Sequence, residues 1–419
     1  MKCRHCAQGL TLGFLDLGSA PPSNAYLTRE ALNAPETWFP LRLLVCQNCW
    51  LVQTEDHAGR DQLFDKDYAY FSSFSSSWLA HARSYVADMR QRLAIGPQSM
   101  VVEVAANDGY LLRYVREAGV PCYGIEPTAS TAAAARGLGL DIIERFFGVE
   151  LALELRAAGR QADLLVANNV LAHVPDINDF VAGFAVLLKA QGVATFEFPH
   201  LLRMVQGCQF DTAYHEHYSY LSLATVQRIF AANGLAVFDV QELGTHGGSL
   251  RVLAQRADAG RHAVDARVAA LLALEQAQGL GGADFYRGFQ TQAVRVKNAL
   301  LAFLLQAQAE GLRVAAYGAA AKGNTLLNFA GVRPDLLPYV VDLNPAKQGR
   351  FLPGSRIPIV DMAHLRADRP DCVLLLPWNL QAELAAQLQE IASWGGRFVT
   401  AVPTLEVLEP ADALGGLSP

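Results

Sequence analysis

The sequence of 419 residues has little charge and no long apolar run. Charged residues make up 18% and hydrophobic residues 52%, a balance that excludes disordered and fibrous proteins. No stretch reaches the roughly 18 apolar residues of a membrane-spanning helix, so we expect no membrane partner. Residues 1–6 lack the apolar core of a secretory signal, and we therefore expect a cytoplasmic protein.

The sequence also lacks an excess of basic side chains. It contains 34 Lys and Arg residues against 40 Asp and Glu residues, which gives a formal net charge of −6. A general nucleic-acid binder needs a basic field to neutralise phosphates, so we expect no nucleic-acid partner. A few local donors would still suffice to hold one small anionic ligand. We expect the protein to be a monomer.

Internal repeats are absent, but short apolar runs alternate with helical patterns. Strand-like runs occur at 100–105, 122–125, 164–167 and 193–198, and again at 313–317, 339–342, 372–376 and 398–402. Helical patterns occur at 78–92, 264–278 and 284–310. Such alternation is typical of parallel α/β domains. We predict an α/β protein with a small N-terminal domain (1–70), a central Rossmann-like domain (71–255) and a second α/β domain (256–419).

Cysteines are few, seven in all, and unevenly placed. Two pairs, Cys3-x2-Cys6 and Cys46-x2-Cys49, have the spacing of metal-binding knuckles. Together they make a closed tetrahedral sulfur site, which suits structural zinc better than a catalytic zinc with an open position. The 39 residues between the pairs exceed the spacing in a usual zinc ribbon. A longer segment must therefore bring the second pair back beside the first. Four buried thiols without a metal are the alternative, and a redox dithiol is disfavoured because no βαβ pattern frames either pair.

An intact glycine-rich phosphate-binding turn is also missing. Residues 101–112 read as strand, tight turn and helix, but of a G-x-G-x-G pattern only Gly109 remains, with Ala105 and Asn107 at the earlier glycine positions. Asp108 would place negative charge where a pyrophosphate sits, so a cofactor with a cationic centre and an amino-acid end fits better. Glu126 follows the next strand, where an acidic residue can accept the hydroxyls of a ribose. This combination indicates S-adenosylmethionine, with candidate contacts from Glu103, Ala105, Asn107, Asp108, Gly109, Glu126 and Asn168.

Ionisable and aromatic residues crowd one segment after the strand at 193–198, namely Tyr214, His215, Glu216, His217, Tyr218 and Tyr220. His173 follows the strand at 164–167, on the side of a parallel sheet where ligands bind. In an extended segment His215 and His217 face one way and Glu216 the other, whereas in a turn this alternation need not hold. Three interpretations stay open: a metal site that includes His200, a buried structural network, and general acid–base machinery, which imidazole chemistry near neutral pH favours.

A second strand-to-helix turn, residues 318–325, fails both common phosphate-binding patterns. Lys322 precedes Gly323, whereas the lysine of a P-loop follows its glycine, and Ala320 stands where G-x-G-x-x-G needs its second glycine. Main-chain amides at the helix start, with Lys322 and Thr325, would still suit a pyrophosphate, and an ordinary packing turn is the alternative. The candidate contacts to the phosphates or the sugar are His246, Ser249, Arg251, Lys322, Asn324, Thr325 and Lys347.

Seven stretches from Cys3 to Thr325 are distinctive. They are the paired cysteines, EVAANDGYLL, NVLAHVPD, EFPHLL, YHEHYSYLS, THGGSLRV and AYGAAAKGNT. With these stretches the sequence resembles the bacterial nucleotide-sugar C-methyltransferases, in particular the sugar 3-C-methyltransferases that make branched deoxysugars. The resemblance covers most of the chain, and its motifs are far more specific than the turn at 105–109.

The resemblance implies an N-terminal zinc domain, a central S-adenosylmethionine-dependent methyltransferase domain and a C-terminal domain that helps hold a nucleotide sugar. It implies a substrate with a 4-keto group on a 6-deoxyhexose linked to a nucleoside diphosphate, most often dTDP. In such enzymes a histidine of the Tyr-x-Glu-His motif removes the C3′ proton, and the enolate attacks the methyl group. By the same resemblance the base is His217, with Tyr214 and Glu216 beside it and with His173 and Tyr68 near the keto oxygen or the proton path.

Two alternatives to a sugar C-methyltransferase remain at this point. One is an NAD-type oxidoreductase that uses the C-terminal α/β domain, and the other is a non-catalytic zinc-containing protein that binds nucleotide sugars. The incomplete glycine patterns disfavour the first, and the dense cluster of His, Glu and Tyr disfavours the second. We therefore expect a C-methyltransferase with S-adenosylmethionine and structural zinc as its cofactors.

Overall fold

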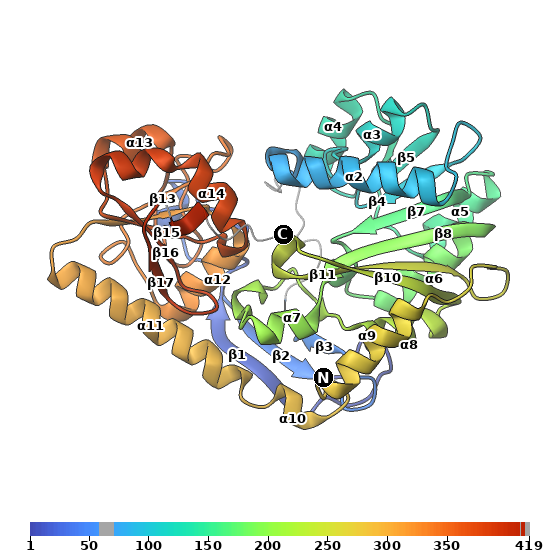
Figure 1. The fold of residues 1–419 in the computed structure, drawn as a ribbon, viewed down its shortest axis with the longest axis horizontal. Helices are drawn as coiled ribbons and strands as arrows, with labels where there is room; N and C mark the ends of the chain where they lie inside the picture. Colours follow the sequence, from blue (N-terminus) through green and yellow to red (C-terminus); the bar gives the residue numbers. More distant parts are fainter. Residues whose placement is uncertain (58–70, 411, 415–419) are drawn as a thin grey trace.

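The computed structural model describes residues 1–57, 71–410 and 412–414 of the chain. It is an α/β protein with three sheets, as predicted. In Figure 1 the seven-stranded sheet and its helices lie in the right half of the view, and the six-stranded sheet and its helices lie in the left half. The N-terminal strands lie at the base between them. Among the described residues, no helix is both long enough and apolar enough to cross a membrane.

The N-terminal sheet contains one strand from a distant part of the chain. Its order is β1-β2-β3-β9 and all its pairs are antiparallel. The strands are β1 (Leu12–Ala20), β2 (Phe39–Val45), β3 (Val52–Thr54) and β9 (Ser219–Tyr220). Val52 pairs with Tyr220, so the chain directly after His217 is a strand of the N-terminal sheet.

The central sheet has the order β10-β11-β8-β7-β4-β5-β6. Strand β11 pairs antiparallel with both β10 and β8, and all the other pairs are parallel. Its strands are β4 (Val101–Val104), β5 (Cys122–Ile125), β6 (Ile142–Ile143), β7 (Ala162–Asn168), β8 (Leu188–Pro199), β10 (Leu235–Leu243) and β11 (Ser249–Arg256). Its helices are α2 (Ser76–Arg92), α3 (Leu112–Glu117), α4 (Ala129–Gly137), α5 (Val149–Ala157), α6 (Ile177–Leu187), α7 (Leu201–Gln206) and α8 (Leu223–Ala232). The carboxyl ends of β4, β5, β7 and β8 meet at one edge, which is where parallel sheets bind ligands.

The C-terminal sheet has the order β14-β13-β12-β15-β16-β17, and only the edge strand β17 is antiparallel. Its strands are β12 (Val314–Tyr317), β13 (Val340–Val341), β14 (Ile359–Val360), β15 (Cys372–Leu375), β16 (Arg397–Thr400) and β17 (Glu406–Leu408). Its helices are α12 (Ala321–Ala330), α13 (Met362–Asp368) and α14 (Gln381–Gln387). The second predicted α/β region is therefore confirmed.

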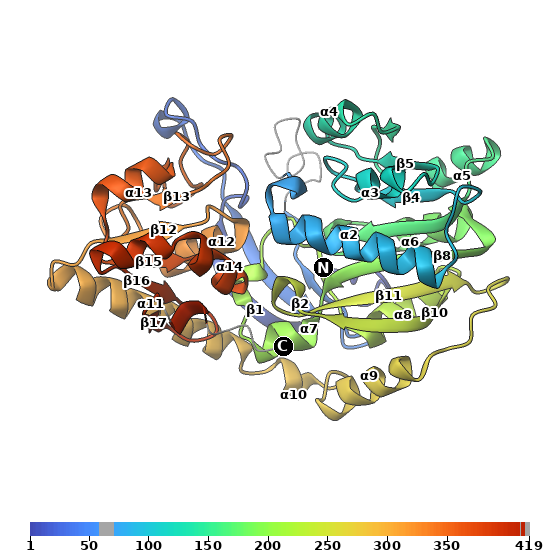
Figure 2. The ribbon, with the colours of Figure 1, turned by 45° about the horizontal axis from the view of Figure 1, so that its top comes forward.

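A chain of helices connects the two large sheets: α9 (Ala266–Ala277), α10 (Ala283–Tyr286) and α11 (Phe289–Ala309). In Figures 1 and 2, α11 runs from the C-terminal sheet to α10 below the N-terminal strands. Phe14 of β1 stacks on Phe289 of α11 with ring centroids 4.6 Å apart, and Trp50 stacks on Tyr286 at 5.7 Å. The N-terminal sheet therefore shares a core with the helices that lead into the C-terminal domain.

Candidate active site and metal centre

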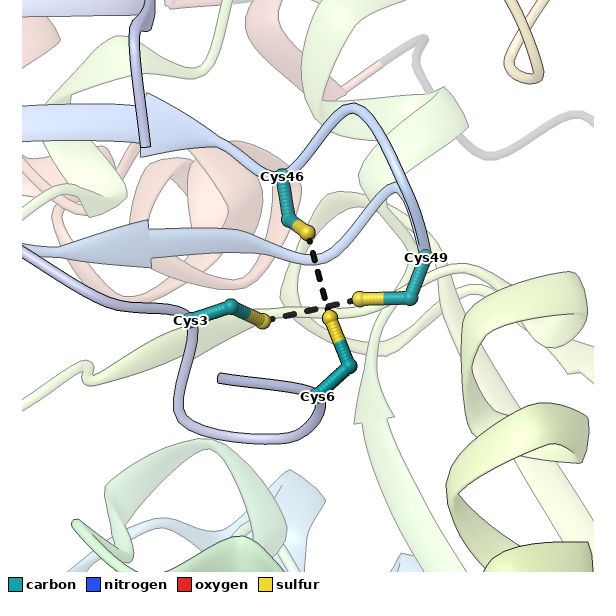
Figure 3. Close-up of side chains that lie close together, drawn as sticks. All are labelled: Cys3, Cys6, Cys46 and Cys49. Atoms are coloured by element: carbon teal, nitrogen blue, oxygen red, sulfur yellow. Dashed lines mark hydrogen bonds between the residues drawn. The ribbon is translucent and has the colours of Figure 1, made fainter. Parts of the chain in front are cut away.

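The four paired cysteines meet in one place (Figure 3). Cys3 and Cys6 come from the N-terminal turn, Cys46 and Cys49 from the turn between β2 and β3, and all four sulfur atoms lie within 4.8 Å of one another. The Cys3–Cys49 and Cys6–Cys46 sulfur pairs are 3.5 Å apart, close to the ~3.8 Å that Zn–S bonds of about 2.3 Å require in a tetrahedron. Within the described ranges this is the single group of three or more candidate metal ligands. The geometry fits a closed structural zinc site.

The two cysteine turns have the same backbone construction. The amide of Ala7 donates to the carbonyl of Cys3 (2.9 Å), and the amide of Trp50 donates to the carbonyl of Cys46 (2.8 Å). Ala7 and Trp50 both adopt left-handed conformations, with φ of 60° and 64°. Each turn therefore closes just after its second cysteine, which leaves both sulfur atoms of the pair on one side.

The turn after β4 is shaped for close approach of a ligand. Ala105, Asn107 and Gly109 all have positive φ, of 59°, 48° and 80°. A Cβ on Gly109 would lie 2.4 Å from a methyl carbon of Leu140, so only glycine fits there. The carboxylate of Glu126 accepts a hydrogen bond from the amide of Asn107 (2.9 Å), which holds it beside the turn.

Two further donors orient the carboxylate of Glu126. The amide of Thr128 and the hydroxyl of Thr131 each donate to Oε1 at 3.0 Å. Burial raises the pKa of Glu126, and its hydrogen bonds oppose that rise. The side chain of Thr128 is a further donor to this carboxylate. Glu126 is thus a preorganised carboxylate at the ligand-binding edge.

The other predicted cofactor residues lie deeper or are engaged by the protein. Asn107 and Asp108 accept hydrogen bonds from the main-chain amides of residues 72 and 73 (2.9 and 3.0 Å), so they hold the segment that leads into α2. Glu103 is fully buried in β4, and burial raises its pKa well above the usual value. Asn168 is buried at the end of β7.

Two histidines from separate loops face each other at this edge. His173 ends a 3₁₀ turn after β7, and its ring centroid lies 4.6 Å from that of His217. Nδ1 of His217 lies 2.8 Å from the carbonyl oxygen of Thr212. Because a carbonyl only accepts, Nδ1 carries the proton and the lone pair is on Nε2. Burial and the neighbouring His173 lower the pKa of His217 well below its usual value, so the ring is neutral at pH 7.

Residues 214–217 form a turn, so the alternation expected of an extended segment does not hold. The amide of His217 donates to the carbonyl of Tyr214 (2.9 Å), and the centroids of the Tyr214 and His217 rings lie 3.9 Å apart. Glu216 accepts two hydrogen bonds from the side-chain amide of Asn24, at 2.7 and 2.9 Å. The N-terminal domain therefore holds the carboxylate beside the base candidate.

The remaining histidines of the metal interpretation point elsewhere. Nε2 of His215 donates to the carbonyl of Pro40 (3.2 Å), towards the N-terminal sheet. Nε2 of His200 forms a buried hydrogen bond with Glu275 (2.7 Å). The ligands that this interpretation needs are thus dispersed, and the part of the chain that the structure describes offers no metal-binding group here.

Lys322 brings the C-terminal domain into the same centre. Its Nζ donates to Asn379 (2.7 Å) and lies 4.8 Å from the ring centroid of Trp378. The charge of Lys322 also helps to lower the pKa of His217. The indole of Trp378 donates to the carboxylate of Asp211 (2.8 Å), a buried group whose pKa burial raises to about 6. These contacts join α12 and the loop after β15 to the loop that carries His217.

An aromatic group borders the cofactor turn. Trp78 of α2 stacks on His81 with ring centroids 4.9 Å apart, and the ring of His246 lies 5.2 Å from that of Trp78. Nε2 of His246 accepts a hydrogen bond from the side-chain amide of Asn169 (3.0 Å). Burial lowers the pKa of His246 to about 4, so this predicted substrate contact is a neutral polar group.

Arg251 and Ser249 make contacts within the protein. Arg251 forms a buried ion pair with Glu197 (2.6 Å), whose other oxygen bonds to His81 (2.7 Å). The hydroxyl of Ser249 donates to the carbonyl of Thr245 (2.9 Å). Arg251 is thus linked to His81 through Glu197, and Ser249 bonds to the residue before His246.

Three candidates from the C-terminal domain are similarly engaged. The hydroxyl of Thr325 donates to the carbonyl of Ala213 (3.0 Å), and Asn324 is buried beside it in α12. Lys347 donates to the carbonyl of Ala319 (2.8 Å) and lies 3.5 Å from Asp342. Tyr68, the remaining catalytic candidate, lies outside the described residues.

Several residues of this centre were not predicted from the sequence. They are Asn24, Trp78, His81, Glu197, Asp211 and Trp378. Each contacts a partner far away in the chain, and their local sequence carries no spacing that marks them. Glu197 alone had a usable signal, because it stands at the carboxyl end of a predicted strand.

Three family models match the chain. A "Putative zinc binding domain" covers residues 3–64, a "Methyltransferase domain" residues 78–240, and a "C-methyltransferase C-terminal domain" residues 244–403. A curated relative, C-methyltransferase NovU of Streptomyces niveus, is 34% identical over 413 residues, which are 99% of this chain and 98% of the relative.

Solved methyltransferase structures show a weaker likeness. Magnesium protoporphyrin IX methyltransferase from Synechocystis PCC 6803 with bound SAM has a TM-score of 0.33 and 15% identity, over 42% of this chain and 79% of that one. An S-adenosylmethionine-dependent methyltransferase from Clostridium acetobutylicum has a TM-score of 0.35 and 10% identity, over 42% of this chain and 92% of that one. The family assignment rests on the three models and on NovU.

The three matched domains follow the order of the three sheets. The oxidoreductase and the non-catalytic binding protein are therefore no longer alternatives. Glu126 and the turn at 105–109 fit S-adenosylmethionine, and the four sulfur atoms fit zinc. The chain belongs to the C-methyltransferase family that includes NovU and is an S-adenosylmethionine-dependent methyltransferase with an N-terminal zinc-binding domain.

Proposed function

We propose that this enzyme methylates C3′ of a nucleotide-linked 4-keto-6-deoxysugar, with dTDP as the nucleotide. A single observation supports the proposal above all others. His217 is buried, neutral and oriented by Thr212 so that Nε2 offers a lone pair at the ligand-binding edge. A carbon acid next to a ketone needs such a base, and a positioned general base contributes about 10²–10⁴ in rate.

The reaction divides into two steps. S-Adenosylmethionine supplies a methyl group that is already activated as a sulfonium. Nε2 of His217 takes the C3′ proton, and the electron pair of the broken C–H bond moves into the enolate of the 4-keto group. The C3′ carbon then forms the new C–C bond as the S–CH₃ bond breaks, and the sulfur leaves as a neutral thioether. Charge and atoms balance without a redox cofactor.

Neighbouring groups would stabilise the enolate oxygen. Tyr214 and His173 flank the ring of His217 on two sides. The phenol of Tyr214 is the proposed donor to the oxyanion, because the neutral ring of His173 has a single N–H, which bonds to the main chain of Glu216. Such donors contribute about 3–4 kcal/mol each when they are preorganised. Glu216, which Asn24 holds in place, is proposed to assist the base, as the family motif implies.

The nucleotide-sugar site is proposed to include the C-terminal domain. Lys322 is a candidate whose charge affects the pKa of His217, as the ring of His246 also does. The other proposed contacts are His246, Ser249, Arg251, Asn324, Thr325 and Lys347. The cofactor contacts are proposed to centre on Glu126 and the turn at 105–109.

Mass spectrometry of a panel of nucleotide 4-keto sugars incubated with S-adenosylmethionine tests the function. A gain of one methyl group on a dTDP-linked 4-keto-6-deoxysugar is the expected result. Because a 4-keto group acidifies the hydrogens on both adjacent carbons, NMR spectroscopy of the product must then locate the new methyl. Methylation at C5′ would overturn the assigned position, and no methylation of any sugar in the panel would overturn the substrate class.

A further inference from the structure

Arg4 is a buried cation inside the first cysteine turn. It stands between Cys3 and Cys6, where a side chain is usually solvent-exposed, yet its side chain is only 4% exposed. A buried charge is unfavourable unless it is paired and hydrogen-bonded. The contacts that stabilise Arg4 therefore show what the zinc-binding turn is attached to.

Every donor of the Arg4 guanidinium has an acceptor. Nε donates to the carbonyl of Tyr218 (3.3 Å), Nη1 to Asp56 (2.9 Å) and to the carbonyl of Pro175 (3.4 Å), and Nη2 to Asp56 (2.5 Å) and the carbonyl of Thr54 (2.7 Å). These are all five N–H groups that an arginine possesses. The guanidinium also lies 4.8 Å from the ring centroid of Tyr218.

Two of these acceptors, the carbonyls of Tyr218 and Pro175, belong to the loops that carry the two facing histidines. Tyr218 follows His217 directly, and Pro175 is two residues beyond His173. Thr54 reinforces the link, because its hydroxyl donates to the carbonyl of His217 (2.5 Å). One guanidinium thus fixes the main chain on both sides of the His173–His217 pair.

The neighbouring residue attaches the same turn to the His173 loop. Nδ1 of His5 donates to the side-chain oxygen of Asn178 (2.8 Å), and the amide group of Asn178 donates to the carbonyls of His5 (2.9 Å) and Arg4 (3.3 Å). Asn178 lies in the first turn of α6, just after the loop that holds His173. The metal-binding turn and this loop are therefore joined by several polar contacts.

We propose that Arg4 is a positioning residue for methyl transfer, which holds the His173 loop and the His217 segment in register from within the zinc-binding turn. It touches neither cofactor nor substrate and acts through the main chain at Tyr218 and Pro175. The zinc site then supports catalysis through geometry, since it orders the turn that presents Arg4. This role rests on the proposed function of His217 as the base.

The variant Arg4→Gln keeps a polar side chain but removes most of the donors. We expect about a 10–100-fold lower kcat, because small misplacements of a catalytic group have effects of this size. We expect the KM for S-adenosylmethionine and the zinc content to stay unchanged. Arg228→Gln is the matched control, because Arg228 donates to the carbonyl of Asn48 in the other cysteine turn (3.1 Å) and contacts neither histidine loop.

Amide hydrogen–deuterium exchange provides a second readout that needs no substrate. Peptides covering 171–178 and 212–220 should exchange faster in Arg4→Gln than in wild type or in Arg228→Gln. Arg4→Lys keeps the positive charge but offers three donors in place of five. Its kcat and its amide exchange rates should therefore be intermediate between those of Arg4→Gln and wild type.

Two outcomes would overturn the positioning role. One is wild-type kcat together with wild-type exchange in a zinc-loaded Arg4→Gln or Arg4→Lys variant. The other is loss of zinc or of cooperative folding in both variants, which would make Arg4 a part of the fold. If wild-type protein methylates no sugar, the proposed function fails, and the amide exchange still decides whether Arg4 orders the two loops.

Discussion

The imidazole rings of His173 and His217 meet edge to face, with their centroids 4.6 Å apart and their planes at 73°. His217 is buried and His173 is half-buried, and burial lowers both pKa values, that of His173 to about 4. A proton on either ring disfavours a proton on the other, because two like charges would share one apolar site. The pair is therefore suited to accept one proton at a time, as removal of a single carbon-bound proton requires.

Replacing His217 by Asn should abolish methyl transfer and also the exchange of the C3′ proton with solvent deuterium. The reason is that both processes need the lone pair on Nε2, whereas ligand binding does not. NMR spectroscopy of the sugar in deuterium oxide measures the exchange, and calorimetry checks that both substrates still bind.

His215→Asn is the control for this variant, since His215 points to Pro40 and should not affect exchange. His173→Asn should slow turnover but leave some exchange. Rapid C3′ exchange in the His217→Asn variant would transfer the role of base to His173 or Glu216.

Stability should fall below pH 6.5 because of two histidines whose pKa values are lowered in the folded state. The folded-state pKa values of His173 and His246 are lowered to about 4, whereas an unfolded histidine titrates near 6.5. Between these values the unfolded chain binds protons that the folded chain does not. Each ring therefore lowers the free energy of unfolding by about 1.4 kcal/mol per pH unit as the pH falls through this window.

Urea unfolding at several pH values between about 7 and 5 measures this slope. His246→Gln removes one of the titrating rings and should flatten the slope by up to about 1.4 kcal/mol per pH unit. An identical slope in wild type and variant would show that His246 is not buried as a neutral ring.

Replacing Glu126 by Gln should weaken S-adenosylmethionine binding about 10-fold or more, because hydrogen bonds to a charged group contribute about 1.5–3 kcal/mol. Affinity for the nucleotide sugar should be nearly unchanged. Isothermal calorimetry with each ligand separates the two effects.

Thr131→Val is the matched control for Glu126, since it removes one donor to the same carboxylate without removing the carboxylate. It should reduce donor affinity much less than Glu126→Gln does. Equal donor affinity in Glu126→Gln and wild type would reject Glu126 as the ribose contact.

Replacing Cys46 by Ser should release zinc and destabilise the N-terminal domain, because the binding energy of a structural metal is also folding energy. Elemental analysis of freshly purified wild type should find one zinc ion per chain. Thermal unfolding should show a lower midpoint for Cys46→Ser than for Cys122→Ser, a cysteine outside the site. Wild type without stoichiometric metal would contradict the assignment.

Much of this architecture follows from local sequence. The spacing of Cys3, Cys6, Cys46 and Cys49 marks a metal site because two-residue gaps place both sulfurs of a turn on one side. The strands around residues 101–104 and 314–317 follow from apolar runs, and the ligand edge follows because parallel strands end together. Glu126 and the turn at 105–109 lie at that edge for the same reason.

Other features depend on contacts between distant segments. Spacing could not distinguish His215 from His217, and the family motif alone favoured the second. In the folded chain the carbonyl of Thr212 orients His217, while His215 faces Pro40, because residues 214–217 form a turn before β9. The bond of Asn24 to Glu216, that of Trp378 to Asp211 and those of Arg4 to the histidine loops likewise need the N-terminal and C-terminal domains to pack on the central one. Such contacts leave no periodic pattern in a sequence, since each depends on packing between segments that are far apart along the chain.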